Sequence, residues 1–193
     1  MANSIYDILA YKAGEEYDKN RMVMVTKPFG QIGLGIPKSI KYYYALKKST
    51  GNNPEIDNQP NYGSPYWGGY KNINNEAVPQ FLWTPSYNLS VTHSPRVNSV
   101  VFGNGYEQRT PDGIYTGLIK MDVTLDLRNQ AESAAILHFL RARKAAESFV
   151  IKNLPPIYAD GGHKKRFVCP NFSSNFTFYD NYSIKTSFVE TNN

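Results

Sequence analysis

The three histidines are the side chains best suited to metal binding or proton transfer in this chain of 193 residues. They are His93, His138 and His163, and each lies in a different expected element. None has a second histidine or a cysteine at the spacing of a ligand pair, and Ala142 occupies the position one helical turn after His138. We therefore expect no metal site and no cofactor.

A pair of carboxylates, Asp122 and Asp126, comes nearest to the pattern of a glycosidase. On a strand their Cα atoms would lie about 13 Å apart, whereas glycosidase carboxyl pairs lie roughly 5–9.5 Å apart. The Gly-Leu-Gly segment at 33–35 lacks the third glycine of a phosphate loop. The single cysteine, Cys169, lies in an apolar stretch where a buried, inert thiol is expected. The sequence therefore predicts a protein that is not an enzyme.

The composition is that of a folded, weakly basic protein. Hydrophobic residues make up 41%, charged residues 19%, and the formal net charge is +5. The basic residues are scattered, and their one dense cluster, at 164–166, follows two glycines and is interpreted as a solvated turn rather than a phosphate contact. No apolar run approaches the roughly 20 residues that span a bilayer, and the N-terminus lacks a secretion-signal pattern. We expect synthesis in a cytoplasm and no membrane insertion.

The sequence pattern changes near residue 80. Residues 49–80 are rich in glycine, proline and asparagine, which favour turns, whereas regular patterning begins after Phe81-Leu82-Trp83. We therefore expect a small, mainly β domain over residues 1–80 and a larger domain over residues 81–193.

The longest strand pattern covers residues 118–127. Apolar and polar side chains alternate there with period two, which indicates a strand with one buried face. The expected buried face is Ile119, Met121, Val123, Leu125 and Leu127. The expected polar face is Lys120, Asp122, Thr124 and Asp126. Further strands are expected at 96–102, 149–152, 165–169, 174–179 and 182–188.

One helix is expected after the long strand. Asn129 can cap it, and Glu132 follows at the spacing of a capping box. An apolar stripe follows at helical spacing, made of Ala135, Ile136, Phe139 and Leu140. Basic residues at 141, 143 and 144 suit the negative end of the helix dipole, although a DNA-binding helix has a similar pattern. Together, the expected strands and the one expected helix predict an α+β domain in which the helix packs on an antiparallel sheet.

A segment before the long strand carries a family signature. Residues 95–109 read PRVNSVVFGNGYEQR, which resembles the Phe-Gly-Asp-Gly-Tyr-x-Gln-Arg motif of the minor tail protein M family of long-tailed bacteriophages (siphophages). Asn104 replaces the usual aspartate. The Asp112-Gly113 loop, the long strand and the helix follow in the family's order, so the resemblance covers residues 83–193.

This resemblance implies a fold similar to phage tail-tube proteins, an antiparallel β-sandwich or barrel with one flanking helix. It implies a structural virion protein, made in the host cytoplasm, that forms a hexameric ring at the tail tip or baseplate between the tube and the central hub. The genomic DNA would pass through the ring non-specifically during ejection. The implied partners are further copies of the chain, the distal tail protein, the baseplate hub and the tape measure protein.

Two sets of residues are expected to matter in such a ring. A hairpin whose glycines permit positive φ would contact a neighbouring subunit through Phe102, Gly103, Asn104, Gly105, Tyr106, Gln108 and Arg109. The polar face of the long strand would line the lumen through Lys120, Asp122, Thr124 and Asp126.

The first 80 residues resemble, with stretched spacing, small chitin-binding-type modules. The resemblance rests on the tyrosines of residues 11–17, the Val strand at 22–25, the Tyr-Ala strand at 42–46, the Gly-x-x-Pro at 51–54 and the Tyr-Trp pair at 66–67. It implies sugar stacking by Tyr43, Tyr66, Trp67 and Tyr70, and an alternative function as a carbohydrate-binding, host-surface adhesion module of the tail. The other interpretation is that these aromatic residues fill a small core without disulfides.

Overall fold

The structure is a computed structural model of the chain. It describes residues 8–27, 39–57, 65–73, 76–87, 89–114, 116–158 and 165–192. His163, Lys164 and the Gly-Leu-Gly segment at 33–35 lie outside these residues.

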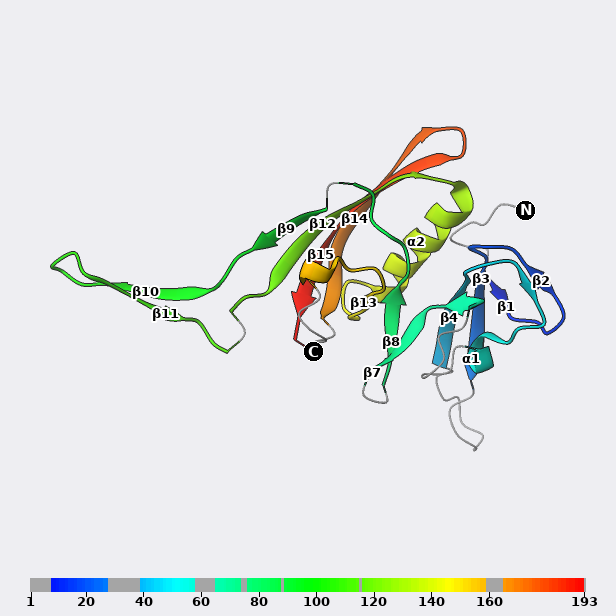
Figure 1. Cartoon of the computed structure of the whole chain (residues 1–193), viewed down its shortest axis with the longest axis horizontal. Helices are drawn as coiled ribbons and strands as arrows, with labels where there is room; N and C mark the ends of the chain where they lie inside the picture. Colours follow the sequence, from blue (N-terminus) through cyan, green and yellow to red (C-terminus); the bar gives the residue numbers. More distant parts are fainter. Residues whose placement is uncertain are drawn as a thin grey trace.

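The central element is a four-stranded antiparallel sheet in the order β14-β15-β12-β9. One helix, α2, packs against it (Figure 1). The elements are β9 (Ser90–His93), β12 (Ile119–Arg128), α2 (Gln130–Arg143), β14 (Arg166–Phe178) and β15 (Asn181–Thr191). The predicted α+β class is confirmed, and the described sheets stay open, so that none closes into a barrel within one chain.

The alternation in β12 produces the predicted buried face over most of the strand. Ile119, Met121, Val123 and Leu125 are buried beneath α2, whereas Leu127 is 69% exposed. The register of β12 against β15 shifts between Leu125 and Arg128, and Leu127 takes a left-handed φ of 54°. The prediction that Leu127 belongs to the buried face is therefore wrong, because the bulge turns its side chain outward.

Replacing Leu127 with asparagine is expected to raise the free energy of unfolding by about 1 kcal/mol. A left-handed backbone is costly for leucine and tolerated by asparagine, and the exposed leucine loses no packing. Urea denaturation would measure the change. The matched substitution Leu9→Asn, at an exposed leucine in a strand, is expected to give no gain. A destabilised Leu127→Asn variant would contradict the argument.

Side chains at the end of β12 and just before β15 hold the start of α2. The Asn129 side chain accepts a hydrogen bond from the Glu132 amide at 2.9 Å, as the capping pattern predicts. The Glu132 side chain does not complete a capping box but accepts from Arg128 at 2.8 Å. A second cap comes from far along the chain, where Asp180 accepts from the Gln130 amide at 2.7 Å. The turn between β14 and β15 is thereby attached to the helix.

The strands expected separately at 165–169 and 174–179 form one strand, β14. Its register against β15 shifts between Val168 and Asn171, and Pro170 lies at this irregularity. Proline cannot donate to a sheet ladder and is tolerated at bulges and edges. The proline and the polar residues after it made one long strand look like two in the sequence.

The first part of the chain forms a second sheet in the order β1-β3-β4-β6 and a two-stranded sheet of β2 with β5. The elements are β1 (Leu9–Ala10), β2 (Glu16–Tyr17), β3 (Met22–Lys27), β4 (Ser39–Ala45), β5 (Ser49–Thr50), the short helix α1 (Pro54–Asp57) and β6 (Trp67–Gly68). Tyr17, Tyr43 and Trp67 are buried in a core of their own, together with Val23 and Ala45.

A third sheet and a shared core join the two parts of the chain. The sheet consists of β7 (Tyr70–Ile73), β8 (Glu76–Phe81) and β13 (Val150–Ile151), with β13 parallel to β8. A 3-10 turn, η1 (Pro156–Tyr158), follows β13. Met22 and Tyr44 lie in the same core as Phe81 and the buried face of α2. The division into domains at residue 80 stays a prediction, and these contacts cross it.

A two-stranded hairpin projects from the body of the molecule, far from the first part of the chain (Figure 1). It consists of β10 (Val97–Val101) and β11 (Glu107–Pro111), which pair with each other. We call residues 97–111 the arm.

Candidate subunit-interaction site

The arm is exposed along its whole length, because every residue from 92 to 111 is classed as exposed. Its exposed apolar side chains include Val100 at 55%, Phe102 at 44% and Tyr106 at 64%. An isolated two-stranded hairpin is marginally stable in water. The arm is therefore an element that gains stability when another surface covers it.

The tip of the arm is the glycine-containing segment of the family signature. The Phe102 amide donates to the Tyr106 carbonyl at 2.8 Å, and the Gly105 amide donates to the Phe102 carbonyl at 2.9 Å. Gly105 has a φ of 80°, and the Asn104 side chain accepts from the Tyr106 amide at 3.2 Å. The turn thus needs glycine at 105, while asparagine at 104 supplies the acceptor that the family's aspartate would supply.

The two faces of the arm differ in chemistry. Directly paired residues share a face, so Ser99, Arg109 and Glu107 lie together on one side, which also carries Val97 and Val101, 50% and 70% exposed. Glu107 accepts from Ser99 and, at 3.0 Å, from Arg109, whose hydrogen bond lowers the pKa of Glu107. The other side carries Val100, Phe102 and Tyr106, and the rings of the last two lie 5.9 Å apart. The predicted interface residue Arg109 therefore lies on the face opposite Tyr106.

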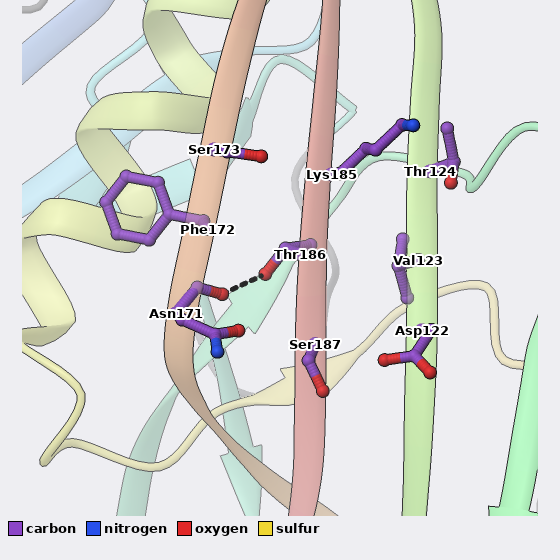
Figure 2. Close-up of a pocket in the computed structure, with 9 residues that line it drawn as sticks. All are labelled: Asp122, Val123, Thr124, Asn171, Phe172, Ser173, Lys185, Thr186 and Ser187. Carbon is purple, nitrogen blue, oxygen red and sulfur yellow. Dashed lines mark hydrogen bonds between the residues drawn. The ribbon is translucent and has the colours of Figure 1, made fainter.

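The predicted lumen-facing residues lie on the sheet face that points away from α2. Lys120 and Asp122 form a 3.8 Å ion pair with both side chains more than half exposed. In register with Asp122, Asn171 of β14 extends the polar surface, and Ser187 of β15 lies between them, only 7% exposed (Figure 2). Thr124, Lys185 and Ser173 form a second such row. The face is polar across the strands, with cationic and anionic groups both present.

This polar face is slightly hollowed. A shallow, open concavity of about 420 Å³ lies over β12, β15 and β14, with the two rows of side chains at its base (Figure 2). Sequence reasoning identified only the β12 part of the surface. The remainder of the surface comes from serine, lysine and asparagine side chains of β14 and β15. Their positions were visible in the sequence, but the register of these strands against β12 was not known from it.

The four-stranded sheet has two terminal strands, β14 and β9. Among the described residues, the outer side of β14 is bridged only at Phe167, which forms an isolated bridge with Phe149, a residue just before β13. From Asn171 to Phe178 the outer edge of β14 has no strand partner among the described residues. An unpaired edge of this length can accept another strand.

An aromatic cluster at the β14–β15 turn was missed by sequence analysis. Phe176, Phe178 and Tyr179 are 59%, 56% and 89% exposed. The signal was present in the sequence FTFYD at 176–180, where three aromatic residues surround one threonine before the turn. We call Phe176, Phe178 and Tyr179 the aromatic tip.

The four residues predicted to stack on sugar form part of an internal aromatic packing. Tyr43 and Trp67 are only 4% and 1% exposed. Tyr66 and Tyr70 are half-buried, with Lys47 over the ring of Tyr66 and Lys41 over that of Tyr70. Tyr43 and Trp67 present no open ring face to a sugar, so their prediction as stacking residues is wrong. The alternative interpretation, a small aromatic core, accounts for these contacts.

The residues considered for catalysis in the sequence do not come together in one site. His93 is exposed in β9, and Cys169 is buried with its thiol 3.0 Å from the Thr186 hydroxyl. Burial raises the pKa of the Cys169 thiol, which opposes formation of a nucleophilic thiolate. Among the described residues, no group of three or more metal-binding side chains lies together. In the same part of the chain, no helix is long and apolar enough to cross a membrane.

His138 has a structural role at the contact between β4 and α2. Its Nδ1 lies 3.0 Å from the Tyr44 hydroxyl, and its ring packs edge-on against Tyr42 at 4.6 Å. Burial, followed by the nearby charge of Arg143, lowers the pKa of His138 to about 4. Burial also raises the pKa of the Tyr44 hydroxyl, so the hydroxyl keeps its proton and can donate to Nδ1. His138 therefore joins the two parts of the chain as a neutral ring.

The free energy of unfolding is expected to decrease as the pH is lowered, because of His138. The unfolded histidine binds a proton near pH 6.5, whereas the folded one binds it only near pH 4. Between these values the unfolded state binds more protons, so acidification destabilises the fold, here by about 3 kcal/mol between pH 7 and pH 4. Urea denaturation at both values would show this loss in the wild type. His138→Gln should lose about 3 kcal/mol less over the same interval, and an equal loss would contradict the assignment.

Comparison with known proteins shows the family to which the chain belongs. A family model described as "Phage minor tail protein" matches residues 79–191. A search of curated proteins finds no match. The matched segment includes the arm, the open sheet and α2, and it confirms the prediction of a phage minor tail family from residues 83–193, whereas the chitin-binding resemblance gains no support. Because the match covers more than half of the sequence, the chain belongs to the phage minor tail protein family.

Proposed function

We propose that copies of this chain form a ring of the distal tail tube, around the channel for the genomic DNA and between the tube and the central hub. Family membership makes the chain a structural component of the virion tail and agrees with a protein that is not an enzyme. The proposal adds its position at the tail tip or baseplate and its assembly as a hexameric ring.

The observation that carries the proposal is the open sheet with one polar face. Its buried face is covered by α2, and its other face is solvated. The terminal strands β14 and β9 leave two edges at opposite sides of the sheet. If the β14 edge of one copy pairs with the β9 edge of the next, the sheets become one closed wall, and the exposed edges disappear.

The polar face suits the inside of that wall. It carries Lys120 and Lys185 beside Asp122 and Asp126, separated by the hydroxyl and amide groups of the rows described above. Mixed charge of this kind leaves little net field, so the phosphate backbone of DNA meets no continuous basic stripe that would bind it. DNA would therefore pass without being held.

The arm supplies a contact outside the wall. Among the described residues its two strands form a separate sheet and pair only with each other, and its signature turn lies farthest from the body (Figure 1). Such an element reaches a neighbouring subunit, which we propose to be another copy of the chain. The distal tail protein, the baseplate hub and the tape measure protein are the proposed partners above, below and within the ring.

Removal of the gene from the parent phage tests this function. We expect particles without the chain to lack complete tails in negative-stain micrographs, and a plasmid copy of the wild-type chain to restore them. Normal tails and normal infectivity without the chain would contradict a structural ring. Normal tails that fail only to adsorb to cells would favour the adhesion function instead.

A further inference from the structure

The outer edge of β14 can accept a strand from another copy only over its second half. At Phe167 both backbone groups are occupied, because its carbonyl accepts from the Phe149 amide and its amide donates to the Phe149 carbonyl, each at 2.8 Å. Pro170 follows at the register shift and has no amide to donate. From Asn171 to Phe178 no strand pairs with this edge among the described residues. An incoming strand therefore has to pair beyond Pro170.

The opposite edge of the sheet is longer than β9 itself. The segment before β9 lies beside the second half of β12, where the Ser86 amide donates to the Thr124 carbonyl at 2.8 Å. Farther along, the Thr84 carbonyl accepts from Arg128 at 2.7 Å. Tyr87 belongs to this segment and is 95% exposed. Its ring thus has little cover from its own chain, at the end of the edge that lies away from the arm.

The two edges match in direction and in the faces of their side chains. Neighbouring strands of the sheet are antiparallel, so β9 of one copy would run antiparallel to β14 of the next. Leu89, Val91 and Phe172 all pack against the core beneath α2. Because side chains alternate between faces along a strand, Phe172 has to pair with an odd-numbered residue of the β9 edge if the polar face is to continue into the next copy.

One register is the first to satisfy both conditions. It places His93, the last residue of β9, opposite Phe172, so that all of β9 lies beyond Pro170. The same register carries the segment before β9 along the free edge of β14 and places Tyr87 opposite Phe178. We propose that β9 of one copy pairs with β14 of the next in this register, with Tyr87 on the aromatic tip of its neighbour. This inference deepens the proposed ring and rests on it.

The pairing covers aromatic side chains that each chain leaves exposed. Phe176 and Phe178 are 59% and 56% exposed. The turn after them is held in place, because Asp180 accepts from the Gln130 amide at 2.7 Å. Opposite residues of an antiparallel pair have Cβ atoms about 4.5–5.5 Å apart, and aromatic rings also reach the diagonal neighbour. Tyr87 would therefore contact Phe178 directly and Phe176 diagonally.

The register also sets the tilt of the strands in the ring. Within one chain, one row across the sheet contains Ser90, Asp122, Ser187 and Asn171. Between copies, Ser90 would instead pair with Asn175, which is four residues farther along β14. A stagger of about four residues for every four strands gives the ratio of the eight-stranded α/β barrel, which has a shear of 8 and a strand tilt of about 36°. This ratio is the same for any number of copies, and the tilt is typical of closed barrels.

Disulfide formation in purified tails measures the register. Thr92→Cys/Ser173→Cys should give a ladder of disulfide-linked multimers, because directly opposite Cα atoms lie about 4.5–5.5 Å apart, within the reach of a disulfide. The matched controls pair Thr92→Cys with Asn171→Cys or with Asn175→Cys. These positions lie diagonally, with Cα atoms about 7–8 Å apart, and should give at least about tenfold less linkage. The native Cys169 is buried, and each single-cysteine variant should give no ladder.

Preferential linkage of either control pair would overturn the proposed register. Linkage of no pair, in tails that contain the variants, would overturn the pairing of these two edges. Neither result would contradict a ring held together by other contacts, whereas absence of the wild-type chain from tails would refute the proposed function.

A charge at Tyr87 keeps the inference testable if the cysteine variants are not incorporated. Tyr87→Asp should leave the urea midpoint of the purified chain unchanged, because the residue is 95% exposed. It should reduce the amount of chain in tails at least about tenfold, because the carboxylate would be buried against the neighbour's aromatic rings. The matched control Ile114→Asp, at a residue 92% exposed outside the paired edge, should stay within about twofold of the wild type. Equal incorporation of the two variants would overturn the contact.

Discussion

A chain in which the whole arm, residues 97–111, is replaced by Asn-Gly is expected to fold normally and to be lost from tails. The Asp112 amide already donates to the Arg96 carbonyl at 3.0 Å, which is the hydrogen bond that closes a two-residue turn between these residues. The removed residues are all exposed and bury no part of the core. The fold therefore loses little stability, while the assembly would lose the neighbour contact that we propose for the arm.

Incorporation would be measured by immunoblotting tails from cells that express only the shortened chain. We expect no detectable chain in tails and an unchanged urea midpoint for the purified protein. The matched control exchanges Ile114, which is 92% exposed just outside the arm, for serine and should incorporate normally. Normal incorporation of the shortened chain would show that the arm has no part in assembly.

The substitution Tyr44→Ala is expected to destabilise the whole chain by about 3–5 kcal/mol. Tyr44 is 2% exposed, and truncation of a buried aromatic side chain costs this much because a cavity remains. Its ring lies 5.3 Å from that of Trp83 and 6.1 Å from that of Phe139. One side chain of β4 thus fills the core formed by β8, β12 and α2.

The unfolding curve should keep a single transition, because the cavity lies in a core to which both parts of the chain contribute. Tyr44→Phe retains the ring and loses the hydrogen bond to His138, which should cost about 1 kcal/mol. Tyr87→Ala, at a residue 95% exposed, should change little. A loss below about 1 kcal/mol for Tyr44→Ala, or a second transition for residues 1–80 alone, would favour two independent domains.

Local patterns were sufficient for the elements around the site. The alternation of residues 119–125 gave the buried and exposed faces of β12 correctly, and the capping pattern at Asn129 gave the start of α2. Both features depend on neighbours in sequence. The exposed position of Leu127 was not predictable in this way, because a register shift against β15 causes it.

Features that depend on distant contacts could not be derived from the sequence. The Asp180 cap on α2 joins residues that are 50 positions apart, and the Tyr44–His138 hydrogen bond joins residues that are 94 positions apart. The extension of the polar face over β15 and β14 requires the strand register, which no local pattern contains. For the aromatic residues 43 and 67, one pattern was compatible with a sugar site and with a core, and only burial distinguishes the two.

An electron cryomicroscopy map of the intact tail tests the central claim most directly. We expect density for this chain as a closed ring on the tail axis, near the tip, with Lys120 and Asp122 facing the channel and the arm of each copy on its neighbour. A map that places the chain outside the axial wall, or with the polar face of β12 turned away from the channel, would contradict the account.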